Sequence, residues 1–346
     1  MRFATAPAPH LIPPSTVPEV MRQVLIALVP AAVAYVWFFG FGLIANLIVA
    51  AAAATATEAL MLRLRRLPIV PTLNDYSALV TAALLAFTLP PLTPWYVTAA
   101  GTVFAIAVAK HLFGGIGFNP FNPAMAGYVV LLVSFPLELN RWLPPSSMEL
   151  AAAQLTLLQS LQVTFTGTLP AGFGWDAVTM ATPLDEMQTG LQRMRMVPEI
   201  LSGPAYGGLG GAGWGWLNLW FAAGGLWLLY RGVIRWHIPV SMLAGLGLMA
   251  ALFHLADADT RPSMMFHLLS GATMLGAFFI ATDPVSAATS TRGRLVYGAG
   301  IGILTYVIRA FAKYPDGLAF AVLIMNAAVP AIDYFTRTRV YGNERR

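Results

Sequence analysis

The sequence predicts an all-α integral membrane protein with about ten transmembrane helices. Hydrophobic residues make up 58% of the 346 residues and charged residues only 10%, and the mean hydropathy is +0.69. A soluble domain carries about 25% charged residues. The apolar residues are gathered in runs, and these runs form two blocks of five on either side of a more polar segment. The 346 residues are therefore expected to form membrane-spanning helices rather than soluble domains.

The two blocks divide the chain into an N-terminal half (1–137), a segment outside the membrane (138–214) and a C-terminal half (215–346). Several runs are shorter than the roughly 20 residues that an upright transmembrane helix needs. Together with internal Gly and Pro residues, this indicates helices that are interrupted or that end inside the protein. The predicted spans are Val24–Phe39, Gly42–Leu60, Tyr76–Leu89, Tyr96–Leu112, Ala124–Leu137, Trp216–Tyr230, Ile238–His254, Met264–Ala281, Leu295–Phe311 and Gly317–Tyr334.

The distribution of basic residues predicts the orientation of the chain in the membrane. With the N-terminus in the cytoplasm, ten spans place 14 of the 20 Lys and Arg residues on the cytoplasmic side. Cytoplasmic loops of membrane proteins carry such an excess. Both termini are therefore expected in the cytoplasm, and the segment 138–214 outside it.

The chain contains no cysteine. This excludes disulfides, thiol catalysis and Cys-ligated iron–sulfur clusters within the chain. No cluster of metal ligands stands out either, and no residue can be assigned a catalytic role. Any redox chemistry must use a cofactor that is held by other atoms.

The segment outside the membrane contains Asp176-Ala177-Val178-Thr179-Met180-Ala181-Thr182. It resembles the flavinylation signature Asp-x-x-(Ser/Thr)-Gly-Ala-Thr, whose last threonine carries FMN through a phosphoester bond. Thr182 supplies the hydroxyl, Asp176 and Thr179 fill the recognition positions, and Met180 departs from the usual Gly. The attachment requires backbone loose enough to enter a transferase active site, and Pro183 is expected to keep the next residue from continuing a helix. The alternative is a chance match in a loop rich in Thr and Ala.

A second tetrapeptide, Ser270-Gly271-Ala272-Thr273, matches the end of this signature more closely. His267 stands where the signature has Asp, however. The tetrapeptide also lies within an apolar run, and we expect it inside a helix that no transferase reaches. Its small residues would allow neighbouring helices to approach closely.

Two further stretches carry polar residues at the ends of apolar runs. Gly114–Ala124 reads G-G-I-G-F-N-P-F-N-P-A, and Asn119 and Asn122 each precede a proline, which disfavours helix. Irregular backbone of this kind is tolerated in a membrane where it is buried in protein or lines a cavity. Asp283, in Ala281–Ser286, could bind a cation, accept a hydrogen bond from a flavin N–H, or cap the next helix.

The two halves show traces of an internal repeat. Thr88-Leu89-Pro90 ends the third predicted span, and Thr282-Asp283-Pro284 ends the eighth. Lys110 and Lys313 hold similar places in the fourth and ninth spans. The offset of five spans is odd, so the halves would have opposite orientations, as in the inverted repeats of many transporters.

In this order, the G-G-I-G-F-N-P-F-N-P-A stretch, D-x-x-T-x-A-T-P-L (176–184), A-T-D-P-V-S (281–286) and G-R-x-x-Y-G (293–298) resemble the RnfD/NqrB family. This family comprises membrane subunits of the Rnf complex and of the sodium-pumping NADH:quinone oxidoreductase. The resemblance covers essentially the whole chain. It implies two inverted five-helix repeats similar to those of urea transporters. The short segment before the first span and Met180 are more similar to the RnfD branch.

The resemblance implies an electron-transfer subunit in the bacterial inner membrane. The Rnf complex passes electrons between ferredoxin and NAD, coupled to proton or sodium translocation. Thr182 would carry covalent FMN in the periplasm, and a non-covalent riboflavin would lie in the membrane part. Asn119, Asn122 and Asp283 are the candidates for holding riboflavin or an ion. The implied partners are Rnf subunits A, B, C, E and G and a flavin transferase, and no nucleic acid.

Two other functions remain open from the sequence. An NqrB-type subunit would take part in quinone chemistry with sodium coupling. A flavin-free transporter of small solutes would use the ten spans and the repeat but leave Asp176–Thr182 without a role. Glu58, Asp75 and Asp333 lie at or near span ends, as helix caps or partners of nearby Arg residues. These three residues do not indicate whether the coupled ion is a proton or sodium.

Overall fold

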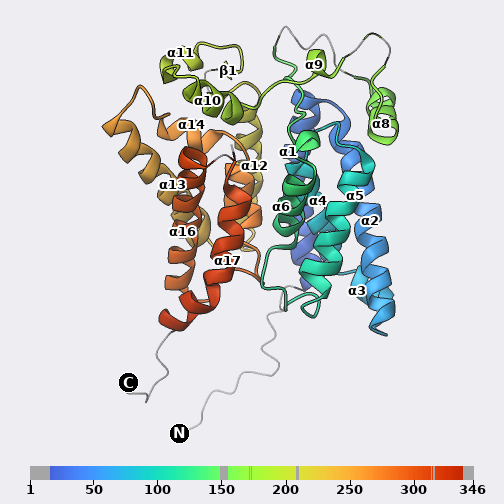
Figure 1. The fold of residues 1–346 in the computed structure, drawn as a ribbon. Coiled ribbons are helices and arrows are strands. Elements are labelled where there is room, and N and C mark those ends of the chain that lie inside the picture. The colour runs from blue at the N-terminus through green and yellow to red at the C-terminus, as the bar shows by residue number, and fades with distance from the viewer. Residues whose placement is uncertain are drawn as a thin grey trace, which may run out of the picture.

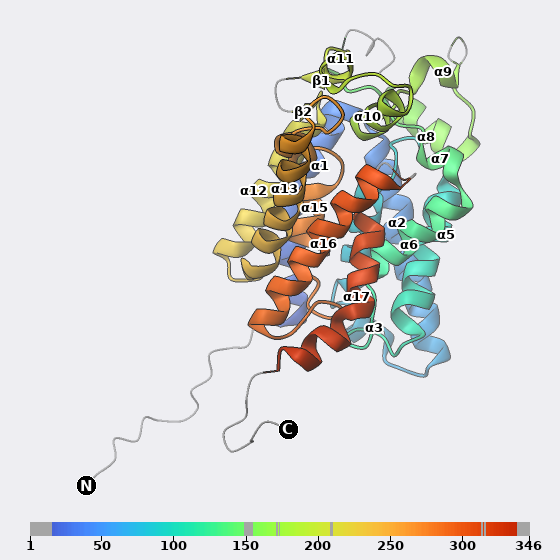
Figure 2. The same cartoon turned by 60° about the vertical axis from the view of Figure 1, so that its left-hand side comes forward.

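The computed structural model describes residues 16–148, 155–170, 172, 174–207, 210–312, 314 and 316–337. Long helices run side by side, and a layer of short helices covers one end of the bundle (Figure 1). This layer stays over the same end when the molecule is turned (Figure 2). The structure is thus an all-α membrane protein with a cap on one side.

Within its described residues, the N-terminal half contributes six α-helices and one π-helix. Each of the first five predicted spans coincides with a helix, and the fourth is an α-helix continued by the π-helix. The short α3 was not predicted. The elements are α1 (Val17–Phe39), α2 (Gly42–Leu64), α3 (Ile69–Leu73), α4 (Ser77–Thr88), α5 (Trp95–Val103), η1 (Phe104–His111) and α6 (Pro123–Ser134).

The segment between the halves forms the cap seen at the top of Figure 1. It has a small core of its own, in which Leu184, Met187, Val197 and Ile200 pack against Phe266 of the C-terminal half. This apolar cluster fixes the cap to the bundle. Its elements are α7 (Pro136–Leu139), α8 (Leu157–Thr166), α9 (Trp175–Val178), α10 (Pro183–Gln192), α11 (Val197–Leu201) and the antiparallel pair β1 (Tyr206–Gly207) and β2 (Gly210–Gly211).

In the described part of the C-terminal half, four predicted spans coincide with single helices, and the eighth is divided among α14, α15 and η3. Five helices of the described residues, α1, α2, α13, α16 and α17, are long and apolar enough to cross a membrane, and α4 and α6 are shorter apolar helices. The number of spans and the repeat remain predictions. The elements of this half are α12 (Trp214–Tyr230), α13 (His237–Ala256), α14 (Met264–Leu269), α15 (Thr273–Leu275), η3 (Gly276–Ile280), α16 (Thr291–Phe311) and α17 (Leu318–Phe335).

The prediction that Ser270–Thr273 lies inside a helix is wrong. Helix α14 ends at Leu269 and α15 begins at Thr273. Gly271 between them has φ +59°, a left-handed conformation that glycine adopts without steric cost. The small residues of this tetrapeptide thus interrupt the eighth predicted span.

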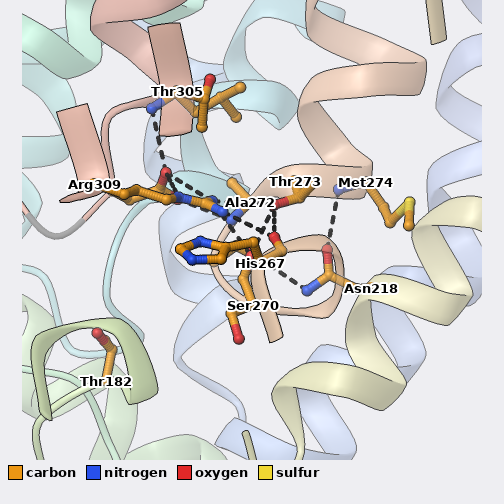
Figure 3. A network of polar contacts seen from close by, with 12 residues as sticks. Thr182, Asn218, His267, Ser270, Ala272, Thr273, Met274, Thr305 and Arg309 are labelled. Atoms are coloured by element: carbon orange, nitrogen blue, oxygen red, sulfur yellow. Dashed lines mark hydrogen bonds and ion pairs between the residues drawn. The ribbon is translucent and has the colours of Figure 1, made fainter. Parts of the chain in front are cut away.

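Polar side chains from neighbouring helices compensate for the break, as Figure 3 shows for Arg309 and Asn218. Arg309 of α16 donates to the His267 carbonyl at 2.8 Å, and Asn218 of α12 donates to the Gly271 carbonyl at 2.9 Å. Asp316 accepts from the Ala272 amide at 2.9 Å. Backbone groups that leave a helix in a membrane need partners of this kind.

Candidate functional site

Two cavities lie between the N-terminal and C-terminal halves. The first, here called the Thr182 cavity, has a volume of about 270 Å³ and lies beneath the cap. The second, here called the Asn122 cavity, has a volume of about 340 Å³ and lies toward the start of α1. Residues of α4, α6 and α12 contribute to both cavities.

Thr182 opens onto the first cavity and is the N-cap residue of α10. Its backbone is extended, with φ −66° and ψ 157°, and Pro183 is the first residue of the helix, a position that proline favours. The expectation that Pro183 keeps the next residue from continuing a helix is wrong, because Pro183 starts a helix of ten residues. The Thr182 hydroxyl is therefore held at a helix N-terminus, where partial positive charge favours phosphate groups.

Asp185 is the closest polar partner of this hydroxyl. Thr182 Oγ1 donates to Asp185 Oδ2 at 2.7 Å and accepts from the Asp185 amide at 3.2 Å. Burial raises the pKa of the Asp185 carboxyl, the hydrogen bonds from Thr182 oppose this, and the charge of Asp316 raises the pKa further. The Thr-x-x-Asp spacing of a capping box is the sequence signal that would have identified this residue.

The walls of the Thr182 cavity are mainly apolar and include several aromatic side chains. Trp142 and Trp214 lie with ring centroids 4.8 Å apart, and Phe87 and Phe221 with centroids 5.3 Å apart. Polar groups gather at the edge that Thr182 and Asp185 share with Gln188, Tyr314 and Asp316. Ligand sites typically combine apolar walls with a few placed polar groups, and the Thr182 cavity has this composition.

The other motif residues lie away from this cavity. Asp176 is exposed in α9, and the Thr179 hydroxyl donates to the Trp175 carbonyl at 2.8 Å. The Met180 amide donates to the Trp142 carbonyl at 2.8 Å, which ties the motif to the cavity wall. The motif thus presents Asp176 to the surface and Thr182 to the cavity.

Asn119, Asn122 and Asp283, separate in the sequence, all line the Asn122 cavity. Asn122 caps α6 by accepting from the Met125 amide at 3.1 Å and donates to the Ile280 carbonyl at 3.2 Å. Asn119 donates to the Phe121 carbonyl at 3.0 Å. These contacts join the irregular segment before α6 to the end of η3.

The Asp283 carboxylate makes local contacts. It accepts from the Val285 amide at 3.2 Å and from the Ser286 hydroxyl at 2.8 Å. The alternative that Asp283 caps the next helix is wrong, because Ser290 is the N-cap of α16 and Asp283 caps only a turn. Lys110, which also lines this cavity, was noted in the sequence only as part of the repeat. A lysine within an apolar run was the signal of a functional group.

Contacts among three phenylalanines link the walls of the two cavities. Phe87 and Phe221 line the Thr182 cavity, and Phe279 lines the Asn122 cavity. The ring centroids of Phe221 and Phe279 are 6.2 Å apart. The walls of the two cavities therefore meet at an aromatic contact.

Among the described residues, no three His, Asp or Glu side chains converge in a way that would hold a metal ion. The polar groups of both cavities are hydroxyls, amides, carboxylates and one ammonium group. Such groups suit an organic ligand that forms hydrogen bonds.

The fold and the cavities define a polytopic helical membrane protein with two internal sites between its halves. The chain belongs to the NQR2, RnfD, RnfE family, whose model matches residues 4–342. It is 50% identical over 353 residues to the D subunit of the ion-translocating oxidoreductase complex of Escherichia fergusonii, with 100% of each chain covered. The Klebsiella pneumoniae (strain 342) protein of the same name is 50% identical over 351 residues, covering 99% of this chain and 100% of the relative.

Proposed function

We propose that the chain is the membrane flavoprotein subunit of an Rnf-type ion-translocating oxidoreductase, with FMN attached to Thr182. The observation that carries this proposal is the position of Thr182, at the start of α10 and in the lining of a mainly apolar cavity. Full-length similarity to subunits named for an ion-translocating oxidoreductase complex supports the redox role. The flavin supplies reversible electron transfer when bound.

The residues around Thr182 have separate roles in this proposal. A transferase joins Thr182 Oγ1 to the FMN phosphorus of FAD, and AMP leaves. Asp185 accepts the hydrogen bond of the hydroxyl before attachment, and the start of α10 favours the phosphate afterwards. Exposed Asp176 is available to the transferase, and the mainly apolar walls of the Thr182 cavity receive the ring.

The Asn122 cavity is the proposed site of the non-covalent riboflavin. Asn119, Asn122 and Asp283 offer amide and carboxylate groups to the polar edge of such a ring. Asn119, Asn122 and Asp283 remain candidates for an ion as well.

The surroundings of the chain follow from the same proposal. The protein lies in the bacterial inner membrane with both termini in the cytoplasm and Thr182 in the periplasm. It assembles with Rnf subunits A, B, C, E and G, and the complex passes electrons between ferredoxin and NAD while translocating protons or sodium. A flavin transferase acts on the chain during maturation.

In-gel fluorescence of the denatured protein, produced together with a flavin transferase, tests the attachment. We expect a fluorescent band for the wild type and none for Thr182→Ala, because only a covalent flavin survives denaturation. Thr189→Ala is the matched control, since Thr189 is an exposed threonine of the same helix. A wild-type band without fluorescence contradicts the proposal, and a fluorescent Thr182→Ala band shows that another residue carries the flavin.

A further inference from the structure

An ionic cluster lies buried beside the Asn122 cavity and has no role in the proposal so far. Lys110 Nζ is 2.6 Å from Glu58 Oε1, and His111 Nε2 is 3.4 Å from the same oxygen. The three side chains are only 1% to 4% exposed. The other carboxylate oxygen, Glu58 Oε2, is buried and has no hydrogen-bond partner among the described residues.

The π-helix η1 creates this arrangement. Lys110 and His111 are consecutive, and in an α-helix of 3.6 residues per turn consecutive side chains point about 100° apart. The wider turn of a π-helix, with i→i+5 hydrogen bonds, reduces this angle, so that both side chains reach Glu58 of α2. Short π-helical segments are frequent at functional sites.

Stability alone does not account for the cluster. Charged groups are costly to remove from water, and an apolar pair of similar volume is often at least as stable as a buried ion pair. Ionisable residues within membrane segments are therefore functional candidates. Glu58 was expected to be a helix cap or a partner of Arg, and it is neither.

The cluster connects the cavity with the exposed surface. On the cavity side, Lys110 Nζ donates to Ser77 Oγ at 2.7 Å, and Ser77 Oγ donates to Asp75 Oδ1 at 2.5 Å. Lys110 and Ser77 both line the Asn122 cavity. On the other side, His111 Nδ1 lies 3.5 Å from Nη1 of Arg65, which is exposed.

We propose that Lys110 is the proton donor of the Asn122 cavity, and that Glu58 and His111 resupply its proton from the exposed side. An ammonium group has three N–H donors. Glu58 and Ser77 take two of them among the described residues, which leaves the third for a ligand in the cavity. The inference rests on the proposed riboflavin in that cavity.

The proton balance is simple. A flavin ring that takes up two electrons from the redox complex becomes basic at N5 and takes up one proton. The Nζ–H bond of Lys110 breaks and an N5–H bond forms, which leaves Lys110 as a neutral amine. His111 takes a proton from the exposed side and passes it to the Glu58 carboxylate, which returns it to Lys110 and restores the ion pair.

The test uses the full-length chain carrying Thr182→Ala, so that only a non-covalent flavin remains. Acid-released flavin per chain is measured first. Stopped-flow reduction of this flavin by titanium(III) citrate is then followed in H₂O and D₂O, for the parent, Lys110→Met and Lys110→Arg. Thr81→Val is the matched control, because Thr81 lines the same cavity and its hydroxyl bonds only to the Ser77 carbonyl among the described residues.

We expect both Lys110 variants to retain flavin and to be reduced more slowly, on the order of 10²-fold, as for loss of a positioned proton donor. The solvent isotope effect should increase, since water must then supply the proton. Lys110→Arg keeps the ion pair, and therefore the fold, but does not give up its proton. The control should behave like the parent.

Two results overturn the inference while leaving the flavin site intact. One is retained flavin with unchanged reduction rate and isotope effect in both Lys110 variants. The other is slow reduction in Lys110→Met with normal reduction in Lys110→Arg, because a positive charge would then suffice. Absence of acid-released flavin from the parent contradicts the proposed riboflavin itself.

Discussion

At the residue scale, the hydrogen bond between Thr182 and Asp185 connects the local fold to the attachment of flavin. The same contact caps α10 and orients the hydroxyl that would be modified. The flavinylation motif ends at Thr182, so the motif itself does not mark Asp185 as part of the site. Only the start of a helix at Pro183 brings Asp185 back to Thr182.

We predict that Asp185→Asn slows flavinylation of Thr182 by roughly tenfold, since general-base assistance is typically worth 10²-fold or more and the transferase supplies part of it. The ionised carboxylate is the better acceptor for the hydroxyl proton. Because burial raises the pKa of Asp185 above its usual 3.8, the wild-type rate should fall as the pH decreases through that raised pKa. The rate for Asp185→Asn should lack this decline.

The measurement is the initial rate of covalent fluorescence with purified transferase between pH 4 and pH 8, expressed as the ratio of wild type to variant. The ratio removes the pH dependence of the transferase itself. Glu186→Gln serves as the control, because its side chain makes no hydrogen bond to Thr182. An Asp185→Asn rate equal to that of the wild type at every pH would show that Asp185 only caps the helix.

At the element scale, the structure differs most from the sequence-based prediction where a helix is interrupted by tertiary contacts. The apolar runs located the helices because hydrophobic residues must face lipid or the protein interior. The break at Ser270–Ala272 was missed because its partners, Arg309 and Asn218, belong to other helices. The small residues of Ser270–Thr273 are compatible both with close packing of helices and with a break in a helix, so the sequence alone does not distinguish the two.

Asn119, Asn122 and Asp283 were selected from the sequence, but the sequence did not predict that they line one cavity. Each residue was selected because it is polar at the end of an apolar run. Their common cavity, and the presence of Lys110 in it, depend on how the two halves meet. The five-span offset predicts that the two halves pack against each other, but it does not predict which side chains face each other.

The contacts of Arg309 at the break in the eighth span are expected to stabilise the fold. Arg309 donates to the His267 carbonyl and pairs with Asp316 at 3.0 Å, and its side chain is 1% exposed. Arg309→Met leaves these groups without their partner, and breaking a buried ion pair costs about 3–5 kcal/mol. We therefore expect a large decrease in the thermal unfolding temperature in detergent.

Arg195→Met is the matched control for this experiment. Arg195 pairs with Glu199 at 2.9 Å, but the two side chains are 40% and 59% exposed. An exposed pair of this kind contributes about 0–1 kcal/mol, so its loss should change the unfolding temperature little. Equal changes for the two variants would contradict the role of Arg309 in holding the break.

At the scale of the whole molecule, the two cavities give the protein two distinct ends. The Thr182 cavity lies beneath the cap, and the Asn122 cavity lies toward the start of α1. The buried Arg309 lies near the capped end, and the buried Lys110 lies near the other. If the cap faces the periplasm, the ionic cluster at Lys110 takes its proton from the cytoplasm.

This orientation can be tested because the chain has no cysteine of its own. Thr189 of α10 and Arg235, between α12 and α13, are both exposed, and they lie on the cap and at the opposite end of the bundle. The excess of basic residues predicts that the end containing Arg235 faces the cytoplasm. Thr189→Cys should therefore react with a membrane-impermeant maleimide in spheroplasts, whereas Arg235→Cys should react only after permeabilisation. The reverse pattern would place Thr182 in the cytoplasm, away from a periplasmic transferase, and would contradict both the orientation and the proposed route of flavin attachment.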